Sequence, residues 1–296
     1  MSPESSRIKN LLELMNVEQI DANIYRGSNP EQTRRRVFGG QVLGQALMAA
    51  GRTVEGRLPH SLHAYFLRPG RPAIPIVYTV DRIRDGGSFN TRRVVAIQDG
   101  EAIFNMSASF HKLEEGFSHQ EAMPGVPPPS ECPGWEELIK ARSGRNGPAP
   151  PWARNRPVEM RPAIARDGFK EEIAQGEGGA LQRFWIKADP MPDDPLLHLC
   201  VAAHTSDHSL LGAMRRPHGG AAGWSRKMMS ASLDHVLWFH KQFRMDSWLL
   251  YHQESPVTAH ARGLALGRYF TEGGELVASV CQEGLIRPVE PQKGRD

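Results

Sequence analysis

The stretch VFGGQVLGQALMAAG, residues 37–51, decides the fold. Its glycine pair, Gly39 and Gly40, precedes a run rich in alanine and leucine, which predicts a helix over residues 41–51. That run contains no acidic residue. The segments that follow it along the chain show what such an apolar helix packs against.

Four strands are predicted after this helix, at residues 60–68, 76–84, 88–98 and 101–111. Asp85-Gly86-Gly87 and Asp99-Gly100 lie between consecutive strands and are typical of hairpin turns. The first part of the chain is therefore one helix followed by an antiparallel meander.

The same order of elements returns later in the chain. A helix is predicted over residues 196–214, followed by strands at 230–240, 248–255, 259–271 and 275–287. Matching Ser61-Leu62 with Ser232-Leu233 gives a shift of 171 residues, and matching Gly100-Glu101 with Gly274-Glu275 gives 174. Three residues of loop account for the difference, so the pattern indicates a duplication.

A proline-rich segment separates the two copies. Ten of the 23 prolines lie between Pro124 and Pro162, which excludes long helices and central strands there. We therefore predict a first domain over residues 1–123, a linker over 124–155 and a second domain over 156–296.

Each copy also has one more candidate strand, near residues 24–26 and 158–164. The fold class predicted is α+β, with two repeats of an antiparallel sheet wrapped around a long helix. This is the double hot-dog arrangement. The two sheets would pair edge to edge and so cover strand edges that otherwise invite aggregation.

The composition is that of an ordinary globular protein, with 40% hydrophobic and 23% charged residues. The net charge of +3 comes from scattered arginines, which favours an anionic small molecule over nucleic acid. No apolar run is long enough to span a membrane and no signal peptide is evident, so we expect a cytoplasmic protein. Cys132, Cys200 and Cys281 lack metal-ligand spacing, so no metal site or disulfide is expected.

Asp207 interrupts the apolar stripe of the second predicted helix. Leu196, Cys200, Ala203, Leu210 and Met214 share its face at helical spacing. An unpartnered buried carboxylate is costly, so Asp207 either has hydrogen-bond partners or lies in a cleft for use. The structural alternative is a carboxylate paired with the nearby His204 or His208.

Two further polar residues occupy strands of the second copy. Gln282 interrupts the apolar face of the last strand, where its counterpart in the first copy is Ala108. Ser232 lies on the first strand of the second meander. Alone, each could satisfy backbone groups, and the case for a site depends on their meeting Asp207.

Such a trio could hold a water molecule, because a carboxylate accepts a proton while a hydroxyl and an amide both donate and accept. The free helix N-terminus at Gly39, Gly40 and Gln41 could bind substrate and supply N–H donors to a developing oxyanion. No cofactor is required.

Other catalytic motifs are absent from the sequence. It has no Gly-x-Ser-x-Gly elbow, no phosphate-binding Gly-x-x-x-x-Gly-Lys loop and no His-Glu-x-x-His pattern. Asp234 and His235 are adjacent on a strand and point to opposite faces, so they are not expected to act as a dyad.

At these residues the chain resembles the TesB-like acyl-CoA thioesterase II family over nearly its whole length. The resemblance is carried by five blocks: VFGGQVLGQAL at 37–47, HSLHAYFLRPG at 60–70, RDGGSFNTRRVVAIQDG at 84–100, SLDHVLWFH at 232–240 and VASVCQEGLIR at 277–287. The family's catalytic Asp, Thr or Ser, and Gln fall on Asp207, Ser232 and Gln282.

The resemblance implies hydrolysis of fatty acyl-CoA to free fatty acid and CoA, in a homo-oligomer such as a dimer or tetramer. Arg68, Arg84, Arg92 and Arg93 are candidates for contacting the CoA phosphates. Two alternatives remain. One is a hot-dog enoyl-CoA hydratase, which uses a His five residues after its Asp. Five residues after Asp207 this chain has Gly212. A non-catalytic acyl-CoA-binding protein would need no base.

Overall fold

The computed structural model describes residues 3–29, 36–143, 156–166, 179–218 and 228–289. The helices are α1 (Pro3–Met15), α2 (Gly39–Gly51), α3 (Trp135–Ser143), α6 (Pro195–Ser206) and α7 (Leu210–Arg215), with 3-10 turns η1 (Pro129–Glu131) and η2 (Arg216–His218). The first-half strands are β1 (Glu18–Asp21), β2 (Ile24–Gly27), β3 (Leu58–Phe66), β4 (Ile76–Asp85), β5 (Phe89–Gln98) and β6 (Glu101–His111). The second-half strands are β7 (Val158–Pro162), β8 (Leu181–Ala188), β9 (Met228–Ser232), β10 (Asp234–Phe239), β11 (Leu249–Ala259), β12 (Arg262–Thr271) and β13 (Leu276–Pro288).

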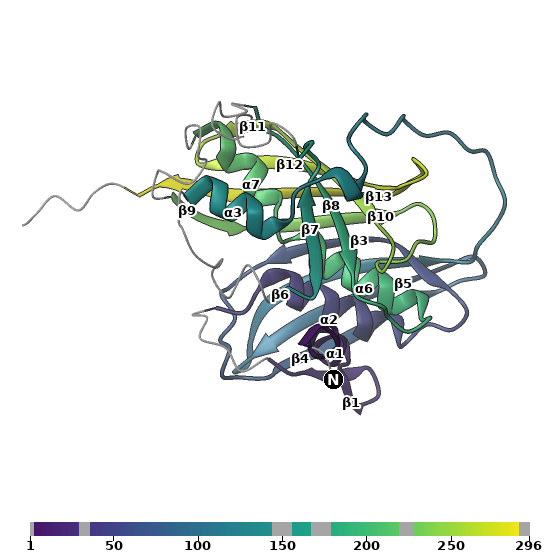
Figure 1. Cartoon of the computed structure of the whole chain (residues 1–296). Helices are drawn as coiled ribbons and strands as arrows, with labels where there is room; N and C mark the ends of the chain where they lie inside the picture. Colours follow the sequence, from purple (N-terminus) through teal and green to yellow (C-terminus); the bar gives the residue numbers. More distant parts are fainter. Residues whose placement is uncertain (1–2, 30–35, 144–155, 167–178, 219–227, 290–296) are drawn as a thin grey trace, which may run out of the picture.

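The described strands form one thirteen-stranded antiparallel sheet, in the order β1-β2-β4-β5-β6-β3-β10-β13-β12-β11-β8-β7, with β9 beside β13. The two halves meet where β3 pairs with β10, and Leu62 lies opposite Leu237 at this seam. The edge-to-edge pairing of two antiparallel meanders is therefore confirmed, and the sheet curves around the helices (Figure 1).

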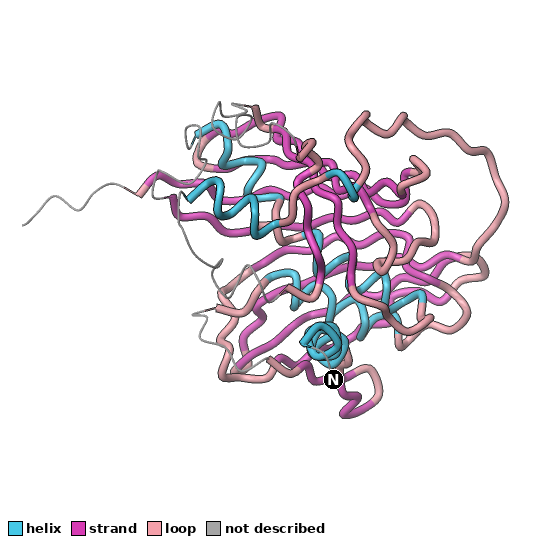
Figure 2. Tube along the Cα trace, in the orientation of Figure 1, coloured by secondary structure: helices cyan, strands magenta, loops and turns pink. Residues whose placement is uncertain are grey.

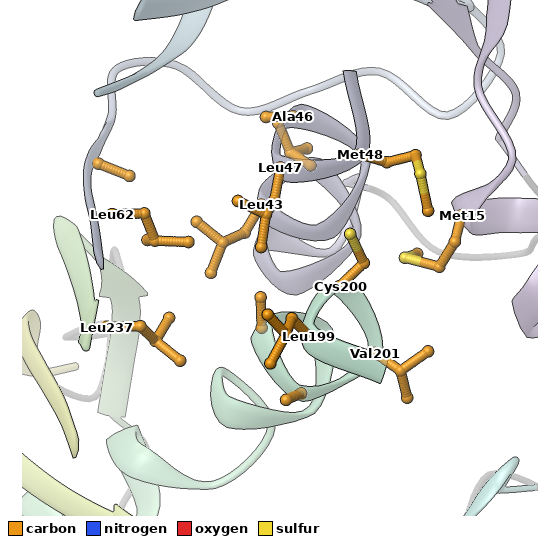
Figure 3. Packing of buried hydrophobic residues seen from close by; sticks show 14 of the residues in the cluster. Met15, Leu43, Ala46, Leu47, Met48, Leu62, Leu199, Cys200, Val201 and Leu237 are labelled. Atoms are coloured by element: carbon orange, nitrogen blue, oxygen red, sulfur yellow. The ribbon is translucent and has the colours of Figure 1, made fainter. Parts of the chain in front are cut away.

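The helices α2 and α6 pack together inside the sheet in opposite directions. A Cβ added to Gly40 would lie 2.3 Å from the His204 carbonyl oxygen, and one added to Gly44 would lie 3.0 Å from that of Cys200. The glycines therefore permit backbone approach that larger residues would block. Figure 3 shows Leu43 and Leu47 of α2 beside Leu199 and Cys200 of α6, with the seam leucines nearby.

The second helix was predicted as one element, and this prediction is wrong, because the helix breaks between α6 and α7. Tyr251 donates its hydroxyl to the Ser206 carbonyl at 2.9 Å, and Gln182 donates to the Ser209 carbonyl at 2.7 Å. Gln253 also donates to the Ser209 hydroxyl at 2.6 Å. Side chains from β8 and β11 thus take over bonding that a continuous helix would make itself.

The structure also differs from the predicted strands in two places. The strand expected at 230–240 is divided into β9 and β10 at Leu233, whose N–H bonds to Glu283 while its carbonyl accepts from Phe66. The strand β8 was not predicted. Its residues Phe184, Trp185 and Ile186 are all buried, so the alternation that marks a one-sided strand is missing.

The chain after β6 runs over the outer face of the second half, as the long loop in Figure 2 shows. Trp185 donates its indole N–H to the Pro127 carbonyl at 2.8 Å, and Gln120 donates to the Gly274 carbonyl at 2.7 Å. The proline-rich region contains the nine-residue helix α3 and otherwise short or irregular structure over the residues described. Within that described part of the chain, no helix has the length and apolar character needed to cross a membrane.

Candidate active site

Asp207 lies at the C-cap of α6 and is 7% exposed. Its Oδ1 accepts a hydrogen bond from Ser232 Oγ at 2.9 Å and another from Gln282 Nε2 at 2.7 Å. The three residues come from α6, β9 and β13 and meet at one oxygen atom. The structure therefore brings together the trio that the sequence singled out, although Asp207 follows the end of α6 instead of continuing its stripe.

The strands fix the other two side chains. Gln282 is fully buried on β13, on the same face as Val280 and Ala278. Ser232 ends β9 and lies opposite Gly284 of β13. The strand pairing therefore holds the hydroxyl and the amide at the same carboxylate oxygen.

The first half completes the site through the start of α2. The N–H of Gly40 donates to the Asp207 carboxylate, and a Cβ added to Gly39 would lie 2.7 Å from its Oδ2. The N-cap residue, Phe38, provides no side-chain cap. The positive end of the α2 dipole thus faces the carboxylate.

Gln41 is placed differently from the two glycines. Its backbone N–H bonds to the Phe38 carbonyl at 3.1 Å, and its side chain donates to Asn29 Oδ1 at 2.7 Å. Of the three residues predicted to bind substrate, Gly39 and Gly40 face Asp207, while Gln41 supports the loop at Asn29.

Burial raises the pKa of Asp207 to about 6, while the hydrogen bonds from Gln282, Ser232 and Gly40 act in the opposite direction. A carboxyl with a pKa this close to neutrality is ionised at pH 7 and remains basic enough to take a proton from water.

His235 was missed as a neighbour of this carboxylate. Its Nδ1 lies 4.0 Å from Asp207 Oδ1, and its Nε2 lies 2.7 Å from Ser206 Oγ. Because Ser206 donates its single hydroxyl proton to the Ala203 carbonyl, Nε2 carries the proton that joins the ring to Oγ. Nδ1 therefore faces Asp207 with a lone pair. Burial lowers the pKa of His235 to about 3, so the ring is neutral.

The sequence signal for His235 was its place among apolar residues. At the two-residue spacing of a strand, His235 lies on the same side as Leu233 and Leu237, as a core residue would. Asp234 accepts instead from the Glu283 N–H at 2.6 Å, which agrees with the expectation that Asp234 and His235 do not form a dyad.

Two buried acceptors beside Asp207 have no hydrogen-bond partner among the described residues, Gln282 Oε1 and His235 Nδ1. Buried polar atoms are normally paired, and an exception needs an explanation. A site that must accept hydrogen bonds from a reacting molecule would provide one.

The opposite end of the α2–α6 pair carries different groups. Arg52 takes the C-cap of α2, the position that Asp207 has on α6. Asp194 caps the start of α6 by accepting from the N–H groups of Leu196 and Leu197. Ala108, the sequence counterpart of Gln282, has no polar side chain. This end therefore lacks counterparts of the Asp207 carboxylate and the Gln282 amide.

Arg92 is 1% exposed and bonds to Thr53 through both the hydroxyl and the carbonyl, with Asp85 as its ion-pair partner. It holds the turn after α2 in place. The Arg92 guanidinium is therefore not available to CoA phosphates, and the prediction that it contacts them is wrong.

Comparison with known proteins identifies both halves. Residues 28–111 match the family described as acyl-CoA thioesterase N-terminal domain, and residues 153–285 match the acyl-CoA thioesterase family. Acyl-coenzyme A thioesterase 8 from Homo sapiens is 39% identical over 292 residues, which cover 94% of this chain and 89% of that protein.

Solved structures show the same likeness. The crystal structure of acyl-CoA thioesterase II TesB2 from Mycobacterium marinum is 44% identical, with a TM-score of 0.76 and coverage of 94% of this chain and 98% of that one. A protein with a hot dog fold from Alicyclobacillus acidocaldarius has a TM-score of 0.73 at 21% identity, covering 94% of this chain and 98% of the other, and shares the fold. The chain therefore belongs to the acyl-CoA thioesterase family, as a thioesterase II type enzyme with two hot-dog repeats in one polypeptide.

Proposed function

We propose that the enzyme hydrolyses fatty acyl-CoA by direct attack of a water molecule that Asp207 activates. The observation that carries this proposal is the buried carboxylate itself. Its Oδ1 accepts from Ser232 and Gln282, and burial raises its pKa to about 6. A base of this strength suits proton abstraction near neutral pH.

In the proposed reaction, the Asp207 carboxylate takes one proton from water as the water oxygen bonds to the thioester carbonyl carbon. The carbonyl π electrons move to its oxygen and form a tetrahedral intermediate. When the carbonyl re-forms, the C–S bond breaks and the CoA sulfur leaves as a thiolate. The proton held by Asp207 then passes to that sulfur, which restores the carboxylate.

Ser232 and Gln282 position the reacting groups in this mechanism. Both hold Asp207 in one orientation through Oδ1. The buried Oε1 of Gln282 has no protein partner among the described residues and can accept the second proton of the water as a hydrogen bond.

The start of α2 is proposed to stabilise the oxyanion. Gly39 and Gly40 carry no side chain between the helix N-terminus and Asp207. Backbone N–H groups and the positive helix end there favour negative charge on the thioester oxygen. This assigns the substrate-binding role to the first half and the base to the second.

The two alternative functions lack comparable support. A hydratase would place a histidine five residues after Asp207, but Gly212 occupies that position and packs close to Gln182. A non-catalytic binding protein would have no use for a buried carboxylate with a raised pKa, whose ionisation costs free energy.

Thiol release tests the proposal. With dodecanoyl-CoA as substrate, a thiol-reactive dye should record continuous formation of CoA. Intact-protein mass spectrometry during turnover should find no acyl adduct, because water attacks directly. A stoichiometric adduct on Ser232 or Cys281 would overturn the mechanism. Burial raises the pKa of Cys281, which disfavours it as a nucleophile.

We also propose that the enzyme is a homo-oligomer of the cytoplasm. Tyr65 and Trp238, on the two seam strands, are 58% and 37% exposed. Large exposed aromatic side chains are enriched at protein interfaces. Light scattering coupled to gel filtration should give a mass of at least two chains.

A further inference from the structure

A cavity of about 470 Å³ lies at the opposite end of the α2–α6 pair from Asp207. The end of α2 at Gly51 and the start of α6 at Pro195 both line it. Its volume is within the usual range for small-molecule sites. Since α2 has thirteen residues, the cavity is about 18 Å from the catalytic end of the helix.

This cavity is the counterpart of the catalytic site under the duplication. Each site combines the N-terminus of one long helix with the C-terminus of the other. Phe66 ends β3 and contacts the catalytic end at Gly39, while Phe239 ends β10 and lines the cavity. The cavity therefore has the same position relative to the helix pair as the site at Asp207.

The walls are apolar and the rim is basic. Carbon-rich side chains from both halves line the cavity: Val54, Leu58, Leu196, Leu199, Phe239 and Phe243. Arg57 and Lys241 supply positive charge, and no aspartate or glutamate is among the lining residues. The Arg57 guanidinium donates to the Gly86 and Gly87 carbonyls and to Asn90 Oδ1, so it contributes its charge and leaves Lys241 to contact a ligand. Glu275 pairs with Lys241 at 2.9 Å from outside the cavity.

Three histidines add hydrogen-bonding groups to this lining, His60, His111 and His240. Burial, with a smaller effect of His111, lowers the pKa of His60, and burial lowers that of His240. These two rings are therefore uncharged at neutral pH. The charge that attracts a ligand comes from Arg57 and Lys241.

The cavity has no group to activate water. Arg52 stands in place of the base, and its guanidinium is committed to Val17 and Asn16. Asp194 already satisfies the N–H groups at the start of α6. A molecule bound here would remain intact.

We infer that this cavity binds a free fatty carboxylate, with its alkyl chain on the apolar walls and its carboxylate at Lys241 on the rim. This rests on the proposed function, because hydrolysis of fatty acyl-CoA releases that molecule. The cavity is then a product site separate from the catalytic one. The close approach of Gly40 and Gly44 to α6 leaves no room for a chain to pass between the helices.

Calorimetric titration with dodecanoate tests this inference, with the catalytic site first saturated by a non-hydrolysable hexadecyl-CoA thioether. One dodecanoate per chain should still bind. Lys241→Glu should weaken that binding roughly fivefold to tenfold, because it reverses the rim charge. Val54→Phe, which fills the cavity, should weaken it as well.

Lys9→Glu is the matched control, because Lys9 is also exposed and paired with a glutamate but lies on α1. It should leave dodecanoate binding unchanged, and dodecanol should bind more weakly than dodecanoate. Absence of binding to the saturated enzyme, equal binding by Lys241→Glu, or equal affinity for dodecanol would overturn the inference.

A fourth result would also overturn the inference. If Val54→Phe blocks the thioether or changes the chain-length dependence of kcat/KM, the cavity is the far end of the acyl channel. Thiol release is measured separately for each variant, so a failure of the proposed hydrolysis is distinguishable. If the proposed hydrolysis fails, CoA formation is absent while dodecanoate binding persists.

Discussion

The two ends of the α2–α6 pair carry the same helix termini but complete them differently. At one end, the start of α2 has no cap of its own and faces Asp207 from the other half. At the other end, α6 is capped by Asp194 from its own chain segment. A helix that caps itself has used its N–H groups for stability, whereas one left open can hold a catalytic carboxylate.

The residues at the C-caps of the two helices, Asp207 on α6 and Arg52 on α2, also differ. Asp207 stays near the helix pair, where Ser232 and Gln282 reach it, while the Arg52 side chain bonds to Asn16. One duplicated architecture therefore yields one end with a buried carboxylate trio and one end without it.

Removing the base should have the largest effect on this asymmetry. Asp207→Asn should lower kcat by about 10²-fold or more, since general-base catalysis contributes on that order. The matched control is Asp194→Asn, which keeps a good N-cap at the opposite end and should change kcat little. Thiol release gives the rates, and circular dichroism checks the fold. Near-normal turnover in a folded Asp207→Asn enzyme would show that the base lies elsewhere.

Adding a side chain at the uncapped start of α2 should have the next largest effect on kcat. In Gly39→Ala the new Cβ would lie 2.7 Å from Asp207 Oδ2 and 2.8 Å from the Phe66 ring, so the carboxylate must move. We expect kcat to fall by about 10²-fold, the usual consequence of a misplaced catalytic group. Gly116→Ala is the control, because nothing lies within 4 Å of its added Cβ. Unchanged kcat in Gly39→Ala would mean that the first half does not shape the site.

Replacing Gln282 by the alanine that the first half has at the equivalent position should lower activity less than the two changes above. Gln282→Ala copies Ala108 and removes one donor to Asp207 together with the proposed water acceptor. A hydrogen bond to a charged group is worth about 1.5–3 kcal/mol, so kcat/KM should fall roughly tenfold to 100-fold. Steady-state kinetics with dodecanoyl-CoA measures this. Full activity would remove Gln282 from the mechanism.

The acid limb of the pH profile should give the smallest of these effects. Asp207 acts as a base only when ionised and its pKa is about 6, so kcat/KM should fall about tenfold per pH unit below 6 and level off above it. Because the Gln282 hydrogen bond lowers this pKa, Gln282→Ala should move the limb to higher pH. A profile that is flat from pH 5 to 8 would contradict the assignment.

Local patterns were enough to predict much of this arrangement. The two-residue period of the last strand placed Gln282 on the buried face, and the glycine pair marked the start of α2. These features depend on residues close together in the sequence. The four strands of the first meander were predicted within a few residues for the same reason.

Contacts between distant segments account for what was missed. The apolar spacing continues through Leu210 and Met214, so nothing local signals the helix break that Tyr251 and Gln253 stabilise from β11. Likewise, Trp185 breaks the alternation of β8 because the chain near Pro127 covers the outer face. The Nδ1 lone pair of His235 depends on Ser206, which comes from another element.

The seam between β3 and β10 also constrains how the chain is made. Residues 61–65 pair with residues 234–238, so the central ladder joins segments at least 169 positions apart in the sequence. A ribosome must therefore synthesise most of the protein before the free edge of β3 finds its partner. Contacts of such long range slow folding and leave an edge open to wrong pairing in the meantime. We expect the nascent first half to depend on chaperone protection until β10 emerges.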